Sequence, residues 1–400
     1  MNVQREKMHY DVVVVGAGPS GLSAAIQLKK LCIESKKDFS VCIVEKGSEV
    51  GSHILSGAIL QPTALHELFP GWEDLSDCPV KVKVKDENLK YLTATKSIKI
   101  PNIFIPPVMH NNGNFIISLG NFCKWMATEA EKLGVEIYPG FAASEAIIEE
   151  NQVKGIVTGD LGVSKEGSHT DNYQPGIEIR SKYTLFAEGC RGNIGKNLIK
   201  YFNLGKNSQH QTYGIGLKEL WEVQPEKSIP GLVSHTIGWP LDKQTYGGSF
   251  LYHLDKNLVS VGFVIGLDYK NPYLSPYEEF QRFKTHPSVR DTFKNGRRIM
   301  YGARALNEGG LQSLPHTCFP GGVLIGCDAG TLNTPKIKGT HTAMKSGMVA
   351  ANGVFDMLSS DETQDTDKLH DNLITSWAGR ELKKARNVRP SFKFGLTVGM

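Results

Sequence analysis

The sequence lacks the features that define several protein classes. None of its seven cysteines forms a C-x-x-C pair, so neither a zinc site nor a loop that binds an iron–sulfur cluster is expected. Scattered cysteines in apolar surroundings, such as Cys42, are typical of reduced, buried thiols, and no disulfide is expected. Runs of about 18 apolar residues are also missing, which argues against a transmembrane helix.

The sequence also lacks a large excess of charge of one sign. The 45 basic and 41 acidic residues leave a net charge of +4, which is too small to indicate a nucleic-acid partner. Residues 1–10 show neither the apolar core of a secretory signal nor the Arg/Ser-rich pattern of a transit peptide. We therefore expect a cytoplasmic or already processed chain that binds no nucleic acid.

The length and composition indicate a globular enzyme of several units. A single hydrophobic core stops growing at about 250–300 residues, and this chain has 400. Its 40% hydrophobic and 22% charged residues exclude a disordered or repeat protein.

The strongest local pattern is a βαβ unit near the N-terminus. Residues 10–15 and 40–44 are short β-branched or apolar runs typical of buried parallel strands, and residues 21–31 have helical spacing. Further along, the pattern predicts an apolar stretch at 54–69, a Pro-rich segment at 101–108, helices at 119–133, 275–283 and 339–358, strands at 135–138, 146–157, 176–186 and 322–326, a hairpin or loop at 159–174, and an antiparallel sheet within 211–264.

A G-x-G-x-x-G motif lies between the first strand and the first helix. Gly16 permits the tight turn, Gly18 lets a diphosphate approach the backbone, and Gly21 lets the helix pack close to the strand. The amino end of the helix offers N–H groups and a positive dipole end to phosphates. We predict that these three glycines bind a dinucleotide together with Pro19 and Ser20 of the same loop.

An acidic residue follows at the expected distance. Glu45 stands 24 residues after Gly21, at the end of the second strand, where a carboxylate accepts hydrogen bonds from ribose hydroxyls and disfavours a 2′-phosphate. The neighbouring Lys46 is predicted to contact the same cofactor. An ordinary Gly-rich turn with a surface glutamate is the alternative, and the motif alone does not separate FAD from NAD.

Two further elements favour FAD. Residues 321–330 are a strand that runs into an acidic turn at Asp328, an element by which flavoproteins hydrogen-bond the ribityl chain; an exposed turn aspartate is the alternative. Residues 185–192 are a strand that ends at Gly189, in the place where flavoproteins of the glutathione-reductase type close over the dinucleotide.

The order of these three elements resembles the large class of FAD-dependent oxidoreductases, in the arrangement of para-hydroxybenzoate hydroxylase. The resemblance implies an α/β (α+β) fold with a glutathione-reductase-type FAD-binding Rossmann domain and a β-rich second domain.

Four longer strings resemble the electron transfer flavoprotein–ubiquinone oxidoreductase family. They are QTYGIGLKELW at 211–221, TYGGSFLYH at 245–253, YGARALNEGG at 301–310 and PKIKGTHTAMKSG at 335–347. The resemblance as a whole extends from about residue 8 to the last residue. This resemblance implies an FAD enzyme that is reduced in two one-electron steps by electron transfer flavoprotein and reduces ubiquinone.

The resemblance also assigns residues. It implies that the backbone at Gly247 and Gly248 hydrogen-bonds the quinone head group, and that Gly339 and Thr340 contact the polar edge of the flavin. From the residues alone, a β-bulge or bend explains the paired glycines equally well. No nucleophile or metal is required, so no catalytic side chain is predicted. Four histidines are expected to be structural: His53, His235, His253 and His341.

The family further implies a peripheral position on a membrane, because ubiquinone is lipid-soluble. We expect the cytoplasmic face of a bacterial inner membrane or the matrix face of the mitochondrial inner membrane, without spanning. The apolar contact surface would map onto Ile54–Phe69 and onto an apolar, membrane-facing insertion at 76–115. Burial in the core explains the apolar residues of the first segment about as well.

Full-length family members carry a further segment with a four-cysteine [4Fe–4S] site. None of the seven cysteines in this chain has the spacing that such a site requires. Because the sequence ends at Gly399-Met400, we expect a split or truncated protein, or one served by a separate ferredoxin-like iron–sulfur subunit. Two alternatives stay open: a flavoprotein similar to geranylgeranyl reductase, and a non-catalytic FAD-binding remnant that docks a redox partner.

The expected division of the chain follows from these assignments. The FAD-binding domain takes residues 1–75, 116–205 and 316–400, the insertion takes 76–115, and the quinone-binding domain takes 206–315.

Overall fold

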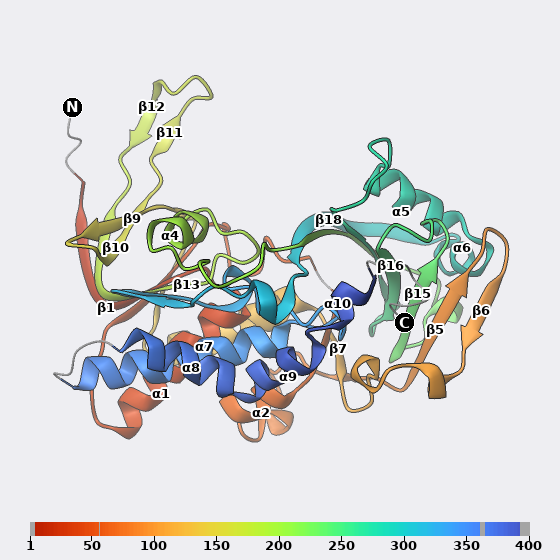
Figure 1. Cartoon of the computed structure of the whole chain (residues 1–400), viewed down its shortest axis with the longest axis horizontal. Coiled ribbons are helices and arrows are strands. Elements are labelled where there is room, and N and C mark those ends of the chain that lie inside the picture. Colours follow the sequence, from red (N-terminus) through yellow and green to blue (C-terminus); the bar gives the residue numbers. More distant parts are fainter. Residues whose placement is uncertain (1–4, 56, 361–364, 393–400) are drawn as a thin grey trace.

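A computed structural model describes residues 5–55, 57–360 and 365–392 of the chain. The Gly399-Met400 end, on which the expectation of a split or truncated protein rests, lies outside these residues. Figure 1 shows two units side by side: a sheet covered by helices, which holds the N-terminal strand, and a second, β-rich unit. The predicted α/β fold class is confirmed.

The first sheet is built from parallel strands. Its order is β20 (Gly322–Leu324), β13 (Glu178–Phe186), β1 (Lys7–Val15), β2 (Val41–Glu45) and β8 (Glu136–Pro139), with β19 (Cys318–Phe319) antiparallel at one edge. Val12, Val13 and Val14 of β1 are buried in succession, because both faces of this sheet are covered. The predicted βαβ unit is therefore confirmed.

Helices cover the two faces of this sheet. On one side lie α1 (Pro19–Glu34), α3 (Leu119–Lys132), α7 (Thr340–Ser359), α8 (Thr366–Thr375) and α9 (Trp377–Ala385), and on the other lies α4 (Gly195–Tyr201) (Figure 1). Helices α1 and α7 approach closely because Gly347 has no side chain: a Cβ there would overlap the backbone oxygen of Ser20 and lie 3.1 Å from the nitrogen of Ala24.

The second sheet has seven strands. Its order is β18 (Arg297–Asn307), β14 (Tyr213–Glu222), β17 (Leu258–Gly266), β16 (Gly247–His253), β15 (Leu232–Gly238), β5 (Asp86–Leu92) and β6 (Ser97–Ile100). The antiparallel sheet predicted within 211–264 is confirmed, but β5 joins β15 in parallel. Residues 86–100 thus complete the sheet of the β-rich unit. Its face is covered by α5 (Pro276–Thr285) and α6 (Pro287–Phe293), where Phe280 and Phe283 contact Phe263.

A β-hairpin extends the first sheet, because one of its strands pairs antiparallel with β13. The strand predicted at 146–157 is wrong as one element: β9 (Ala143–Glu149) and β10 (Gln152–Thr158) form a hairpin, since Glu150 and Asn151 take left-handed φ values of 49° and 59°. The polar segment after it is a hairpin as predicted. The remaining elements are β3 (Ala58–Leu60), β4 (Val82–Lys83), β7 (Phe115–Ile117), β11 (Leu161–Val163), β12 (His169–Gln174), α2 (Thr63–Leu68), α10 (Val388–Ser391), and 3-10 turns at Trp72–Asp74, Asn102–Phe104, Pro107–Met109, Pro225–Lys227, Gly310–Ser313 and Gly326–Asp328.

The apolar stretch at 54–69 is mainly core. The side chains at positions 59, 60, 65, 68 and 69 are buried because α2 and β3 pack beneath the first sheet's helices, so the membrane contact predicted for them is wrong. Exposed apolar side chains lie instead within 76–115. They are Ile98, Ile103 and Phe104, whose exposed fractions are 55%, 86% and 74%.

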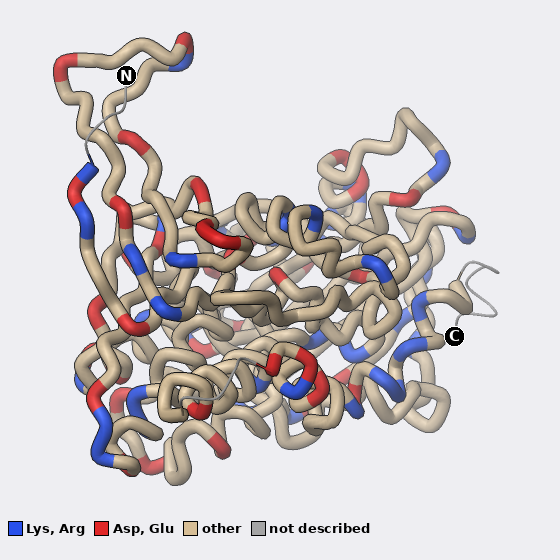
Figure 2. Tube along the Cα trace, turned by 60° about the vertical axis from the view of Figure 1, so that its left-hand side comes forward, with Lys and Arg blue, Asp and Glu red and all other residues tan. Residues whose placement is uncertain are grey.

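Residues of both charge signs are present in similar numbers, 45 basic and 41 acidic. Figure 2 shows basic and acidic residues interspersed along the chain. Within the described ranges, no helix combines the length and apolar character needed to cross a bilayer.

The contact between α1 and α7 gives a stability prediction. We expect Gly347→Val to lower the free energy of unfolding by about 1–3 kcal/mol, because the added side chain overpacks a backbone-to-backbone contact. The control is Gly205→Val, where the nearest atom to an added Cβ is Ile199 Cγ2 at 3.9 Å and the change stays within about 0.5 kcal/mol. Urea unfolding of both variants measures the difference, and equal stabilities would contradict the proposed packing constraint.

Candidate functional site

The Gly-rich loop joins β1 to α1 and leaves open space at one residue. Gly16 has a φ of +109° and lies against the carbonyl of Ala187, whereas a Cβ on Gly21 would overlap the carbonyl oxygen of Gly16. Both glycines are therefore required by packing. Around Gly18, by contrast, no atom lies within 4 Å of an added Cβ. The loop thus presents bare backbone to an open cavity at the amino end of α1.

The acidic residue at the end of β2 holds this loop in shape. Glu45 accepts hydrogen bonds from the backbone nitrogens of Ala17 (2.9 Å) and Gly47 (2.7 Å). Each carboxylate oxygen can accept a further hydrogen bond, and the residue lines the cavity beside the exposed Lys46. The position predicted for a ribose contact is thus also a structural support for the glycine turn.

The third element follows β13. Gly189 takes a φ of +88° and lines the cavity with open space beside it. The preceding Glu188 turns its carboxylate to the backbone nitrogens of residues 193–195, at 2.8–3.2 Å, and so holds the start of α4. This glycine therefore presents backbone to the cavity while its neighbour fixes the loop.

Asp328 lies behind the cavity wall. Its carboxylate is buried next to the backbone nitrogen of Glu188 at 3.4 Å, whereas its neighbour Cys327 lines the cavity. Burial, and after it the charge of Glu188, raises the pKa of Asp328 well above its usual range. The contact with a ribityl chain predicted for Asp328 therefore remains a prediction.

The start of α7 faces the same cavity. Gly339 and Thr340 line it, and no side chain caps the first turn of this 20-residue helix. Its leading N–H groups and positive dipole end are available to a ligand. The sequence placed a helix here correctly.

The paired glycines begin strand β16 in regular register. Gly247 pairs with Ile265 and Gly248 with Val264, so the alternative of a β-bulge is not observed. A Cβ on Gly248 would lie 2.8 Å from the oxygen of Thr236, and one on Gly247 would overlap the oxygen of Val264. Packing alone thus requires glycine at both positions, and both also line the cavity.

One continuous cavity of about 1390 Å³ contains most of the predicted residues. A drug-sized ligand occupies about 300–1,000 Å³, so this volume accommodates more than one such group. Of the predicted site residues, all line the cavity except Gly21 and Asp328, which lie behind its wall. The cavity runs between the two units and also reaches Phe104, Pro106 and Met109 of the segment that carries exposed apolar side chains.

Sequence reasoning missed three titratable groups in the cavity wall, Lys218, Glu308 and Lys338, and expected His235 only to be structural. Burial lowers the pKa of Lys218 and Lys338 to about 8 and that of His235 to about 3, and it raises the pKa of Glu308 to about 7. The three missed residues stand in the quoted strings at 211–221, 301–310 and 335–347, and their place in the family-like strings was the available signal.

The four histidines differ in their surroundings. Three are buried and hydrogen-bonded: His235 Nε2 contacts the Tyr252 hydroxyl at 3.0 Å, His253 Nδ1 accepts from the Ile229 nitrogen at 3.1 Å, and His341 Nε2 contacts Glu381 at 2.8 Å. The fourth, at position 53, is exposed at the cavity edge. In the described ranges, no group of three or more His, Cys, Asp or Glu residues is arranged to hold a metal ion.

Solved structures share this fold at low identity. A geranylgeranyl bacteriochlorophyll reductase-like protein from Thermoplasma acidophilum superposes with a TM-score of 0.74 at 18% identity, over 97% of this chain and 88% of that one. A flavin-dependent brominase gives 0.67 at 17% identity, over 97% and 88%. At these identities the likeness describes the fold alone.

Family models and curated relatives are more specific. The model of the ubiquinone-binding part of ETF-QO matches residues 213–306, and a Rossmann-like NAD(P)-binding model matches residues 14–72. Electron transfer flavoprotein-ubiquinone oxidoreductase of Pseudomonas aeruginosa is 55% identical over 99% of this chain and 73% of its own length. The human mitochondrial protein of that name is 52% identical over 98% of this chain and 64% of its own length. The chain therefore belongs to the electron transfer flavoprotein-ubiquinone oxidoreductase family.

Proposed function

We propose that this oxidoreductase binds FAD in the cavity and passes electrons from electron transfer flavoprotein to ubiquinone. The observation that carries the proposal is the continuity of the cavity, whose wall includes the Gly-rich loop at one end and Gly247 and Gly248 at another. A ligand at each end would share one continuous space. The 55% sequence identity to a named family member supports this chemistry.

The wall fits the parts of FAD. The diphosphate would lie on the backbone of Gly18, Pro19 and Ser20, at the amino end of α1, where N–H groups and the helix dipole favour negative charge. Glu45 and Lys46 would take the ribose of the adenosine half, and Gly189 would approach the dinucleotide closely. When bound, the flavin supplies the capacity to accept and release electrons one or two at a time.

The flavin ring would then lie between the two units. Gly339 and Thr340 would hold its polar edge at the amino end of α7, and Asp328 would approach its ribityl chain after a local shift of the Glu188 contact. The protein's own contribution is to orient the ring, exclude water and tune its potential.

The quinone would enter from the apolar side of the cavity. Leu241 and Ile237 line the wall near the paired glycines, and the cavity reaches Phe104 and Met109, next to the exposed apolar segment. A lipid-soluble substrate needs such an opening toward hydrocarbon. We therefore propose a peripheral membrane position in which residues 98–104 contact the lipid, on the cytoplasmic face of a bacterial inner membrane or the matrix face of the mitochondrial one.

The route of electron entry is the finer part of the proposal. We propose that a [4Fe–4S] module supplied outside the described residues, such as a separate ferredoxin-like subunit, takes part in it. The reductase-like fold neighbour does not favour an isoprenoid reductase, because fold likeness at 18% identity carries no substrate.

A turnover experiment tests this function. FAD-loaded protein is mixed with reduced electron transfer flavoprotein and a short-chain ubiquinone analogue, with and without a ferredoxin-like subunit, and quinone reduction is followed by absorbance. We expect turnover only in the supplemented sample. Failure of both samples, while chemically reduced protein also leaves the quinone oxidised, would favour the non-catalytic remnant instead.

The diphosphate position predicts a separation of binding from folding. Gly18→Val is expected to weaken FAD binding about 10- to 100-fold, equivalent to about 1–3 kcal/mol, because the side chain fills the open space beside the loop. Stability of the FAD-free protein stays within about 0.5 kcal/mol, since Gly18 has an ordinary φ of −85° and no atom near the added carbon. Fluorescence titration with FAD measures the affinity, with Gly205→Val as the control; unchanged affinity would rule out this position for the diphosphate.

The membrane contact predicts a loss of lipid binding. Ile103→Glu should weaken co-sedimentation with phospholipid vesicles about tenfold or more, because burying an isoleucine contributes about 1.5–3 kcal/mol. Tyr273→Glu, at a side chain that is 91% exposed and outside the cavity wall, serves as the control and should leave binding unchanged. Equal losses in both variants would argue against a specific contact through residues 98–104.

A further inference from the structure

Within the described part of the chain, Lys338 is a buried cation without an ion-pair partner. Only 3% of its surface is exposed, yet it lines the cavity. Its ammonium group donates to the backbone oxygen of Lys336 at 3.0 Å, and among the described residues no carboxylate forms an ion pair with it. Of the three donors on the ammonium group, two therefore have no protein acceptor in the part of the chain described.

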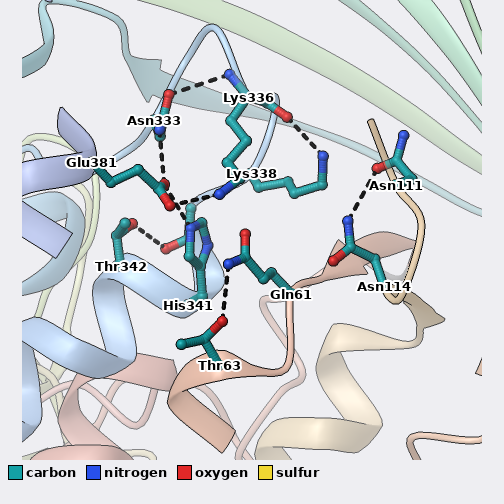
Figure 3. Close-up of polar contacts among 11 residues, drawn as sticks. Gln61, Thr63, Asn111, Asn114, Asn333, Lys336, Lys338, His341, Thr342 and Glu381 are labelled. Atoms are coloured by element: carbon teal, nitrogen blue, oxygen red, sulfur yellow. Dashed lines mark hydrogen bonds and ion pairs between the residues drawn. The ribbon is translucent and has the colours of Figure 1, made fainter. Parts of the chain in front are cut away.

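The neighbouring lysine shows the contrast. Lys336 Nζ pairs with Glu381 at 2.5 Å, and the same carboxylate accepts from Asn333 and contacts His341. Figure 3 shows that Lys336 points toward Glu381, whereas the ammonium group of Lys338 points away from it. The carboxylate nearest in the network is thus already used, and Lys338 faces elsewhere.

The position of Lys338 makes its charge more costly. It immediately precedes Gly339, the residue that begins the uncapped amino end of α7, where the helix dipole is positive. Burial, and after it repulsion from Lys336, lowers the pKa of Lys338 to about 8, so the group still carries its proton at pH 7. A buried charge is retained only where a partner compensates it.

Glu87 and Glu381 favour the charged form of Lys338, but neither forms an ion pair with it within the described ranges. Lys338 is influenced by charged or titratable groups on five elements or loops, and each carboxylate among them holds other groups at close range. Glu87 of β5 contacts His110 at 2.7 Å and the Asn111 nitrogen at 2.9 Å. The groups concerned are Lys336, Glu87, Glu381, His235 and His341.

We propose that the ammonium group of Lys338 stabilises the negative charge that the flavin ring gains on reduction. The inference rests on the proposed function, because it requires FAD in the cavity with its polar edge at Gly339 and Thr340. Lys218 also lines the cavity, but it lies on β14, away from these residues in the chain, and donates to the Gly57 oxygen at 2.8 Å. The lysine adjacent to the flavin-edge residues is therefore the one assigned.

The chemical consequence is a raised reduction potential. A cation near a group that becomes anionic favours the charged form by about one to three powers of ten. Lys338 would therefore make the bound flavin easier to reduce, which suits an enzyme that must accept electrons before passing them on. Lys338 would hold this positive charge beside the polar edge of the ring, at Gly339 and Thr340.

The test compares Lys338→Met with Lys345→Met. Lys345 lies on α7, outside the cavity wall, and pairs with Glu67 at 2.5 Å, so its loss removes a lysine and an ion pair without touching the site. FAD absorbance is recorded first for both variants and the wild type. Sulfite affinity and the midpoint potential are then measured, because sulfite binding leaves a flavin ring negatively charged.

Lys338→Met is expected to bind FAD, to bind sulfite about tenfold more weakly and to show a two-electron potential lower by about 30 mV, which corresponds to that factor. Lys345→Met should match the wild type in both measurements. If Lys338→Met holds FAD with unchanged sulfite affinity and potential, the inference is overturned. If the wild type itself binds no FAD, the proposed function fails instead, so the two failures are distinguishable.

Discussion

The backbone of the Gly-rich loop is the constraint on which the rest of the site depends. It is fixed by the hydrogen bond from the Gly16 nitrogen to the Val44 oxygen (2.8 Å) and by the Glu45 carboxylate on the nitrogen of Ala17. The close approach of Gly347 to Ser20 then fixes α7 against α1. Because α7 begins at the cavity, packing far from the ligand sets where the second helix end points. The two helix amino ends are thereby held in one wall.

The β-rich unit completes the same space from the other side. Strands β15 and β16 bring His235 and Gly248 to the cavity, and the parallel addition of β5 brings the Pro-rich segment and Phe104 to its edge. The half lined by helix amino ends thus adjoins a half in which Leu241 and Phe250 lie beside polar residues such as Thr236. This division matches a charged dinucleotide that stays bound and a lipid-soluble quinone that exchanges, and it places Lys338 at the boundary between the units.

The sequence predicted the parts of the fold that depend on local pattern. The βαβ unit, its glycines and the helix at 339–358 follow from buried strands and motif spacing, which neighbouring residues determine. The hairpin at Glu150 was missed because two non-glycine residues take left-handed φ values. The burial of Leu65 and the pairing of β5 with β15 depend on long-range contacts, and an apolar run alone does not distinguish a core from a membrane surface. Lys338 was overlooked for the same reason, since its lack of a carboxylate partner among the residues the structure describes is a property of the packed structure.

We propose that FAD and ubiquinone occupy one cavity at the same time, on either side of this boundary. Calorimetric titration of the FAD-loaded protein with a short-chain ubiquinone analogue, recorded together with the visible flavin spectrum, tests it directly. We predict one quinone per chain, bound without release of FAD and with a perturbed flavin band. Displacement of FAD by the quinone, or binding that leaves the flavin spectrum unchanged, would contradict the shared cavity.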